Sequence, residues 1–319
     1  MATTATVHFE RKPVFTLEMP FGQQMQIINH RFEPRWRSAV AEVTILSGLH
    51  GDELDGGLVC HMLSQFLQRL GNNWKLNGIV NILPNVNPLS GNLGQRFVPM
   101  MGSDLNRNFP GNHIGFESER LAAAIFGVTS QSLLCIDIHS SNNFLEELPQ
   151  TRIVNEPAVV DWAATLDLDL IWTHSAHNWI SGTIAQSLYE RNINALVIEV
   201  GTGSRLNRLY CERVFRGILQ CLRSLGVLTN GTPVSPSNAL RANESNVTYL
   251  NAESGGLFVP ASGLKLGDHL RRGARLGQII DPLFGQETDV LVASSGVLFT
   301  LRVNPVVYAG SLVARILQT

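Results

Sequence analysis

Charged side chains are scarce in this sequence. Lys, Arg, Asp and Glu make up 16 % of the 319 residues, whereas typical soluble proteins contain about 25 %. The 24 basic and 26 acidic residues give a net charge of −2, so the chain has no basic surplus for binding nucleic acid or an anionic membrane surface. Because charges are few, each clustered charge is more informative than usual.

Long apolar runs and cysteine clusters are also missing. The N-terminal segment MATTATVHFERKPVF has no apolar signal-peptide core, and no stretch approaches 18 consecutive apolar residues. The four cysteines, Cys60, Cys135, Cys211 and Cys221, are scattered along the chain and are expected to be small core residues, not a disulfide framework. These absences favour a soluble, cytoplasmic protein that neither spans nor binds a membrane.

Short apolar runs rich in β-branched residues alternate with helical stretches over the first 225 residues. The predicted strands are 43–48, 79–84, 133–138, 168–172 and 195–200. The predicted helices are 54–70, which Gly71 is expected to end, and 116–126, 157–166, 182–191 and 206–224. This alternation predicts an α/β domain whose parallel or mixed sheet is covered by helices on both faces.

The composition of the sequence changes after about residue 226. The segment 226–243 is rich in Gly, Pro, Ser, Thr and Asn and has no periodicity, as is typical of a linker. From Asn246 onward, short β-type runs separated by glycine-containing turns indicate a small all-β barrel or sandwich. We therefore predict two domains, a catalytic α/β domain at 1–240 and a β domain at 241–319.

The strongest local signal is a group of potential metal ligands at strand ends. In SGLHGDELDG, His50 directly follows a predicted buried strand and Glu53 is expected to begin the next helix. His139, in CIDIHSS, ends another buried strand. Carboxyl ends of strands in open α/β sheets carry ligand sites, and two His with one Glu form the ligand set of a catalytic zinc site. For His50 and Glu53 alone, helix capping is the simpler alternative.

Two further carboxylates lie in apolar strands. Asp137 is two residues before His139 and shares its face of the strand, so Asp137 could orient that histidine from behind the metal. A buried, hydrogen-bonded carboxylate without any metal is an equal alternative. Glu199 lies in the run ALVIEV, where desolvation penalises its charge, so we expect either a buried salt-bridge partner or a general base.

Two polar loops follow the predicted strand 79–84. They are NVNPLSGNLGQRF at 85–97 and GSDLNRNFPG at 102–111. The adjacent Asn106 and Arg107 could bind a carboxylate together, and Arg96 is a second candidate cation. On composition alone, turn residues with a surface arginine are the more common explanation.

Taken in order, HGDE (50–53), DLNRNFPG (104–111), DIH (137–139) and IEVG (198–201) resemble the zinc carboxypeptidase superfamily, and specifically its succinylglutamate desuccinylase/aspartoacylase branch. Two features select the branch. His139 follows Glu53 by only 86 residues, and the segments 255–281 and 294–316 are similar to the barrel-type C-terminal domain of that branch. The resemblance covers the chain from about residue 40 to its end.

The resemblance implies a three-layer, zinc-carboxypeptidase-like catalytic domain. It also implies that His50, Glu53 and His139 hold one Zn²⁺ per chain and that Glu199 acts as general base and acid. Asn106 and Arg107 match the pair that holds the substrate, and Arg96 matches the arginine that polarises the scissile carbonyl. The implied activity is hydrolysis of the amide bond of an N-acyl amino acid or a similar small N-acyl compound, and relatives often form homo-oligomers.

Other functions remain open on the sequence. The same chemistry could serve a metallocarboxypeptidase or amidase acting on peptides or cell-wall fragments. A binding module of the lipoyl or biotinyl type would need a lysine at a hairpin tip, and Lys265 in SGLKLGDH does not have that context. An inactive relative is a weaker alternative, because all the motif residues are present. The roles of His174, His177 and Thr183, upstream of Glu199, cannot be matched.

Overall fold

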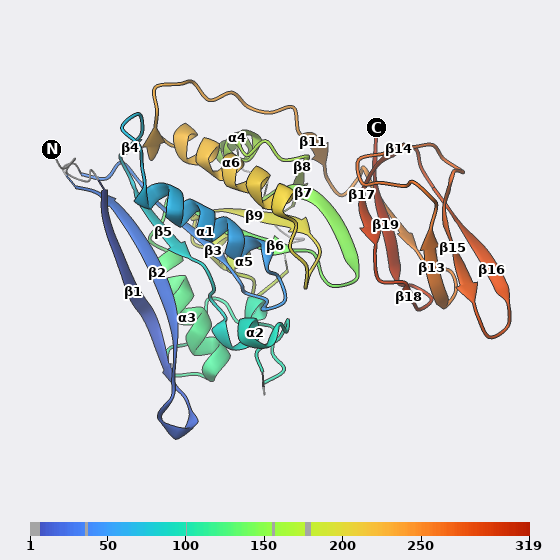
Figure 1. Ribbon diagram of the computed structural model, residues 1–319, viewed down its shortest axis with the longest axis horizontal. Helices are drawn as coiled ribbons and strands as arrows, with labels where there is room; N and C mark the ends of the chain where they lie inside the picture. Colours follow the sequence, from blue (N-terminus) through green and yellow to red (C-terminus); the bar gives the residue numbers. More distant parts are fainter. Residues whose placement is uncertain (1–6, 36–37, 100, 155–156, 176–179) are drawn as a thin grey trace.

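The computed structural model describes residues 7–35, 38–99, 101–154, 157–175 and 180–319. An α/β part contains all the helices, and a smaller part made of strands lies at one end of the long axis (Figure 1). In the described residues, no helix is both long enough and apolar enough to cross a bilayer.

A long mixed sheet runs through the molecule. Its centre consists of four parallel strands, in the order β5 (Ile79–Leu83), β3 (Glu42–Ser47), β6 (Leu134–Ser140) and β9 (Asn194–Gly201). These strands are almost continuously apolar and buried, because helices cover both of their faces. The predicted mixed sheet of an α/β fold is confirmed, and four of the five predicted strands form its parallel centre.

Further strands extend the sheet on both sides of this centre. An antiparallel hairpin, β1 (Val7–Glu18) and β2 (Gln24–Pro34), pairs with β5. On the other side, β7 (Leu145–Val154) runs antiparallel to β9, and β8 (Leu170–His174) pairs with β7 in parallel. The short strands β4 (Lys75–Leu76) and β10 (Leu228–Thr229) form a separate two-stranded sheet.

The helices form two layers around the sheet (Figure 1). Side chains of α1 (Asp55–Gln68), α4 (Pro157–Thr165) and α6 (Arg208–Ser224) share one apolar core with the central strands. Side chains of α3 (Glu117–Thr129) and α5 (Ile184–Tyr189) share the core on the opposite face. The architecture of the α/β part is therefore helices, sheet and helices in three layers, and all four cysteines are buried and free.

Several elements differ from the sequence-based expectations. Helix α1 ends at Gln68, so Gly71 lies beyond it and does not end it. The loop expected at 85–97 contains a short helix, α2 (Pro88–Leu93), because Asn87 caps its N-terminus by accepting from the Ser90 N–H and Pro88 suits the first turn. Strand β7 was not predicted, since its sequence LEELPQTRIV buries polar side chains and has no apolar period.

The C-terminal strands form two packed sheets. β12 (Val247–Asn251), β17 (Gly296–Arg302) and β19 (Leu312–Gln318) continue the long sheet, and the short β14 (His269–Leu270) pairs with β17. The others form a four-stranded sheet in the order β16 (Gln286–Leu291), β15 (Arg275–Asp281), β13 (Gly256–Pro260) and β18 (Val306–Val307). One apolar core lies between these sheets. Of the two expected forms, barrel or sandwich, the described strands do not close into a barrel but form two sheets.

Strand pairing crosses the predicted boundary at residues 240/241. Beyond the extended segment that follows α6, β11 (Leu240–Ala242) pairs in parallel with β8. β17 pairs with β7, with Thr300 opposite Glu147. The division into domains at 1–240 and 241–319 stays a prediction, but the two parts are joined by backbone hydrogen bonds as well as by the chain.

Candidate metal and catalytic site

The candidate residues meet at the carboxyl ends of the central strands. His50 and Glu53 lie in the loop between β3 and α1, and His139 is the penultimate residue of β6. Glu53 precedes the helix by two residues and does not begin it as expected. Glu199 on β9 is the register neighbour of His139, so the two side chains leave the same face of the sheet.

A cavity of about 550 Å³ lies above these strand ends, and all eight residues selected from the sequence line it. They are His50, Glu53, Arg96, Asn106, Arg107, Asp137, His139 and Glu199. The chain brings them together from four separate segments because the parallel strands all end at this edge. The structure thus places them in one site, while their individual roles stay predictions.

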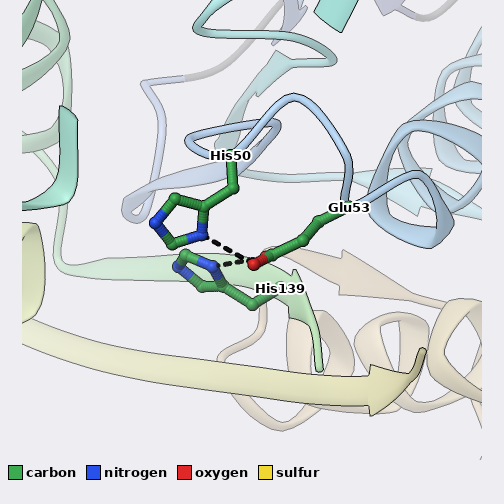
Figure 2. A group of neighbouring side chains, drawn as sticks. All are labelled: His50, Glu53 and His139. Atoms are coloured by element: carbon green, nitrogen blue, oxygen red, sulfur yellow. Dashed lines mark hydrogen bonds and ion pairs between the residues drawn. The ribbon is translucent and has the colours of Figure 1, made fainter. Parts of the chain in front are cut away.

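The two histidines and Glu53 converge on one point (Figure 2). The Glu53 carboxylate lies 2.7 Å from His50 Nδ1 through Oε1 and 2.8 Å from His139 Nδ1 through Oε2. One ligand atom from each residue lies within 4.8 Å of the others, and all three residues are buried. Three nitrogen and oxygen donors at this spacing, on the wall of a cavity, could hold a divalent ion such as zinc with a coordination position left open.

The second nitrogen of each histidine is held by a carboxylate. Asp137 Oδ2 lies 2.8 Å from His139 Nε2, and Asp104 Oδ1 lies 3.0 Å from His50 Nε2. A carboxylate behind each imidazole fixes the ring and leaves the Nδ1 lone pair for a metal, which is the usual arrangement around ligand histidines. The donor set therefore fits zinc, and the position of Asp137 behind His139 is the one expected for a residue that orients a ligand histidine; its role stays a prediction.

Asp104 was not selected from the sequence. It is the first residue of DLNR, and its carboxylate also caps the short turn at Leu105–Arg107 by accepting from the Asn106 N–H. The signal was available, because Asp104 is a charged residue directly before the selected pair Asn106 and Arg107.

Electrostatics at the ligand group favour ionised carboxylates. Burial raises the pKa of Glu53, but His139 and His50 together outweigh it and bring that pKa to about 2. Burial lowers the pKa of His139, and the neighbouring Asp137 and Glu53 reverse this and raise it well above its usual value. The carboxylates around the histidines therefore stabilise positive charge at this point, either a proton on an imidazole or a bound cation.

Arg96 lies beside the ligand group. Its guanidinium donates to Glu53 Oε1 at 3.1 Å and to Asp104 Oδ2 at 3.3 Å. The side chain is 31 % exposed and lines the cavity. Arg96 is therefore close enough to the ligands to contact a substrate group bound next to them.

Asn106 and Arg107 differ in how firmly they are held. The Asn106 side chain is buried, and its Oδ1 accepts from the Ile184 N–H at 3.0 Å, which leaves the amide N–H groups to donate into the cavity. Arg107 is exposed, and among the described residues its guanidinium donates only to the neighbouring Asn106 carbonyl, at 2.6 Å. This guanidinium is available for a carboxylate of a ligand.

Glu199 is paired with an arginine that the sequence reasoning missed. Glu199 Oε1 lies 3.2 Å from Arg152 Nη1, and the Glu199 side chain is 15 % exposed. Burial raises the pKa of Glu199 despite the opposing effect of Arg152. Glu199 thus has the salt-bridge partner that was one of its two expected roles, and its raised pKa is compatible with proton transfer; the general-base role stays a prediction.

Arg152 belongs to a chain of ion pairs along the cavity wall. Arg152 Nη2 donates to Glu147 Oε2 at 3.0 Å, and Arg315 Nη1 donates to Glu147 Oε1. Arg315 lies on β19, so the C-terminal strands contribute a side chain to the cavity. Glu147 and Arg152 were missed because β7 was not predicted, whereas Arg315 is a single charge in the apolar run SLVARIL and could have been noticed.

Two of the three remaining candidates upstream of Glu199 lie at the cavity. His174 lines the cavity, and burial lowers its pKa to about 4. Thr183 also lines the cavity and caps α5 by accepting from the Gln186 N–H. His177 lies outside the described residues.

Comparisons with known proteins agree with this arrangement. A model of the succinylglutamate desuccinylase/aspartoacylase catalytic domain matches residues 39–225. The N-alpha-acetyl-L-2,4-diaminobutyric acid deacetylase of Halomonas elongata is 29 % identical over 160 residues, which cover 46 % of this chain. That match spans 43 % of the relative, less than half of its length.

Solved structures share the fold over nearly the whole chain. A succinylglutamate desuccinylase/aspartoacylase from Rhodobacter sphaeroides has a TM-score of 0.81 at 23 % identity, covering 98 % of this chain and 94 % of its own. The product-bound ectoine utilization protein EutE (DoeB) from Ruegeria pomeroyi has a TM-score of 0.80 at 18 % identity, covering 98 % and 95 %. The C-terminal sheets are therefore part of the shared fold.

Proposed function

The chain belongs to the succinylglutamate desuccinylase/aspartoacylase family, and from this we propose that it is a zinc-dependent deacylase that hydrolyses the amide bond of an N-acyl amino acid or a similar small N-acyl compound. One observation carries the proposal. Three potential metal ligands, a glutamate with a raised pKa and an arginine that has no carboxylate partner in the described part of the chain face one cavity. The cavity volume, about 550 Å³, suits a small molecule.

Zinc is the proposed metal, held by His50, Glu53 and His139. The two imidazoles and one carboxylate are its usual ligands in hydrolases, and Asp104 and Asp137 hold the rings from behind. Bound there, zinc would lower the pKa of a water molecule and polarise the substrate carbonyl.

The protein's own groups would carry the remaining steps. Asn106 and Arg107 bind a substrate carboxylate and thereby orient the scissile amide. Glu199 accepts a proton from the attacking water and delivers it to the leaving amine nitrogen. Arg96 donates to the carbonyl oxygen as negative charge develops on it. The positions of Arg96 and Glu199 beside the ligand group support these roles.

The first test is an activity assay joined to metal analysis. Purified protein is expected to contain about one zinc per chain and to release free amine from at least one member of a panel of N-acyl amino acids. Chelation should abolish the activity and zinc should restore it, because the proposed mechanism depends on the metal to lower the pKa of the attacking water. A protein that binds no divalent metal after dialysis against zinc would refute the assignment, and hydrolysis of short peptides alone would favour a carboxypeptidase.

Replacing Arg107 with Met is expected to raise KM about 10- to 100-fold, because a hydrogen bond to a charged group contributes about 1.5–3 kcal/mol. The effect on kcat should be smaller, since Arg107 is proposed to bind a part of the substrate that does not react. Steady-state kinetics measure both constants. The matched control is Arg208→Met, in which the replaced side chain is 81 % exposed and lies outside the cavity; an equal change in both variants would contradict the assigned role.

A further inference from the structure

The arginine side chains on the cavity wall differ in whether a carboxylate of the protein already pairs with them. Four arginines line the cavity: Arg96, Arg107, Arg152 and Arg315. Arg96 pairs with Glu53 and Asp104, Arg152 with Glu147 and Glu199, and Arg315 with Glu147. Within the described part of the chain, Arg107 is the only one of the four without a carboxylate partner.

Arg152 and Arg315 are held in place by more than their ion pairs. Both guanidinium groups lie over the Trp172 ring, at 5.3 and 5.6 Å from its centre, and Arg315 also lies 5.5 Å from the Tyr249 ring. Their Nε atoms are shielded from solvent and have no hydrogen-bond partner among the described residues. Glu147, which both arginines share, is buried and accepts a further hydrogen bond from Gln150 at 2.7 Å. A second ligand carboxylate would have to compete with Glu147 for these two guanidinium groups.

The acidic side chains of the cavity wall also pair with other side chains of the protein. Glu53 and Asp137 hold the histidines, and Glu147 and Glu199 hold arginines. A cationic group on a ligand would therefore find no unpaired carboxylate among the described lining residues.

The uncharged part of the wall includes several apolar side chains that are open to the cavity, besides the polar Ser140, Ser141, Asn142 and Thr183. Phe144 and Ile180 line it and are 49 % and 57 % exposed, and Leu145, Ala185 and Val197 line it as well. Large apolar side chains exposed on the wall of a small-molecule cavity are typical of groups that a ligand covers.

We propose that the substrate carries a single carboxylate, bound by Asn106 and Arg107, and otherwise uncharged, apolar groups. This inference rests on the proposed deacylase function and narrows its substrate class. It separates this chain from enzymes whose substrates carry a second carboxylate, such as an N-succinyl or N-acylglutamate compound, or an added ammonium group, such as N-acetyl-2,4-diaminobutyrate.

The test compares N-acyl amino acids that differ in the number and sign of their charges. The panel is N-acetyl-L-norleucine, N-succinyl-L-norleucine, N-acetyl-L-glutamate and N-acetyl-L-2,4-diaminobutyrate, assayed with the zinc-loaded protein and also titrated for binding by calorimetry. We expect kcat/KM and affinity to be at least about tenfold higher for N-acetyl-L-norleucine than for the other three, since each 1.4 kcal/mol of differential binding gives a factor of ten. Equal or better values for any of the other three would overturn the inference.

Failure of the two proposals can be told apart. Hydrolysis that favours N-acetyl-L-glutamate refutes the single-carboxylate inference and leaves the deacylase function standing. If none of the four compounds is hydrolysed but N-acetyl-L-norleucine still binds best, the deacylase function fails while the inference about the ligand class holds. If none is hydrolysed and none binds better than the others, both proposals are refuted.

The Glu147→Gln variant should shift the substrate preference toward compounds with a second carboxylate. Glu147→Gln removes the carboxylate shared by Arg152 and Arg315 and leaves Arg315 without an ion-pair partner. We expect the ratio of kcat/KM for N-acetyl-L-glutamate to that for N-acetyl-L-norleucine to rise at least about tenfold, because a released guanidinium can bind the second carboxylate. An unchanged ratio in a folded variant would contradict the inference, and the wild-type panel decides the question if the variant does not fold.

The matched control is Glu146→Gln. Glu146 precedes Glu147 on β7 and does not line the cavity, because adjacent strand residues point to opposite faces. This variant should keep the wild-type preference.

Discussion

Glu199→Gln is expected to reduce kcat about 10²- to 10⁴-fold, the range that a positioned general base and acid supplies. The amide is close to the carboxylate in size, so the variant keeps the shape of the side chain and removes its ability to accept a proton from water. Burial already raises the pKa of Glu199, which suits a group that must accept a proton and then release it to the leaving amine. Zinc content and KM should change little, since Glu199 is not one of the three ligand residues.

Single-turnover kinetics and metal analysis on the purified variant would check this expectation. Glu190→Gln provides the same substitution at an exposed glutamate on the surface and should behave like the wild type. Full activity of Glu199→Gln would refute the proton-transfer role. A loss of zinc together with activity would instead mean that Glu199 supports the metal site.

His50→Ala should produce the second large effect, a loss of zinc affinity greater than the roughly 10- to 100-fold that follows removal of a carboxylate behind a ligand. The substitution removes one of the three donors that converge on the site. It also leaves Glu53 and Asp104 without the imidazole that bridges them. Activity at limiting zinc should fall in parallel with occupancy.

A graded series makes this prediction sharper. Asp104→Asn keeps all three ligands and removes the charge that holds His50 from behind and pairs with Arg96, so its zinc affinity should fall by a smaller factor, about 10- to 100-fold. His113→Ala removes an exposed histidine from a loop and should leave zinc binding unchanged. Equal zinc affinities for His50→Ala and the His113→Ala control would contradict the assignment of His50 as a ligand.

The sequence predicted the α/β architecture and the location of the site for a physical reason. Central strands such as 133–138 are buried on both faces and form uninterrupted apolar runs, so His139 and Glu199 are conspicuous where such runs end. Helix 54–70 has a regular apolar period because only one of its faces is buried. Strong local patterns of this kind do not depend on the rest of the fold.

Features that depend on distant contacts were not predictable. β7 buries Glu147 and Gln150, and this is stable only because Arg152 and Arg315 pair with Glu147. Neither partner can be assigned from local sequence, since Arg315 is 168 residues away. The C-terminal strands were recognised as β structure, but whether they close into a barrel depends on pairing between strands, and β17 pairs with β7 of the α/β part.

The ion pair between Glu147 and Arg315 also bears on how the protein is made. The ribosome must add 168 residues after Glu147 before Arg315 exists. The edge of β7 that pairs with β17 is open until residues 296–302 have been made. Until Arg315 follows, Arg152 is the one ion-pair partner of Glu147 among the described residues. An α/β part that folds as it emerges from the ribosome would therefore contain an unfinished cavity, and the last strand would complete the wall in a late step that depends on contacts distant in sequence.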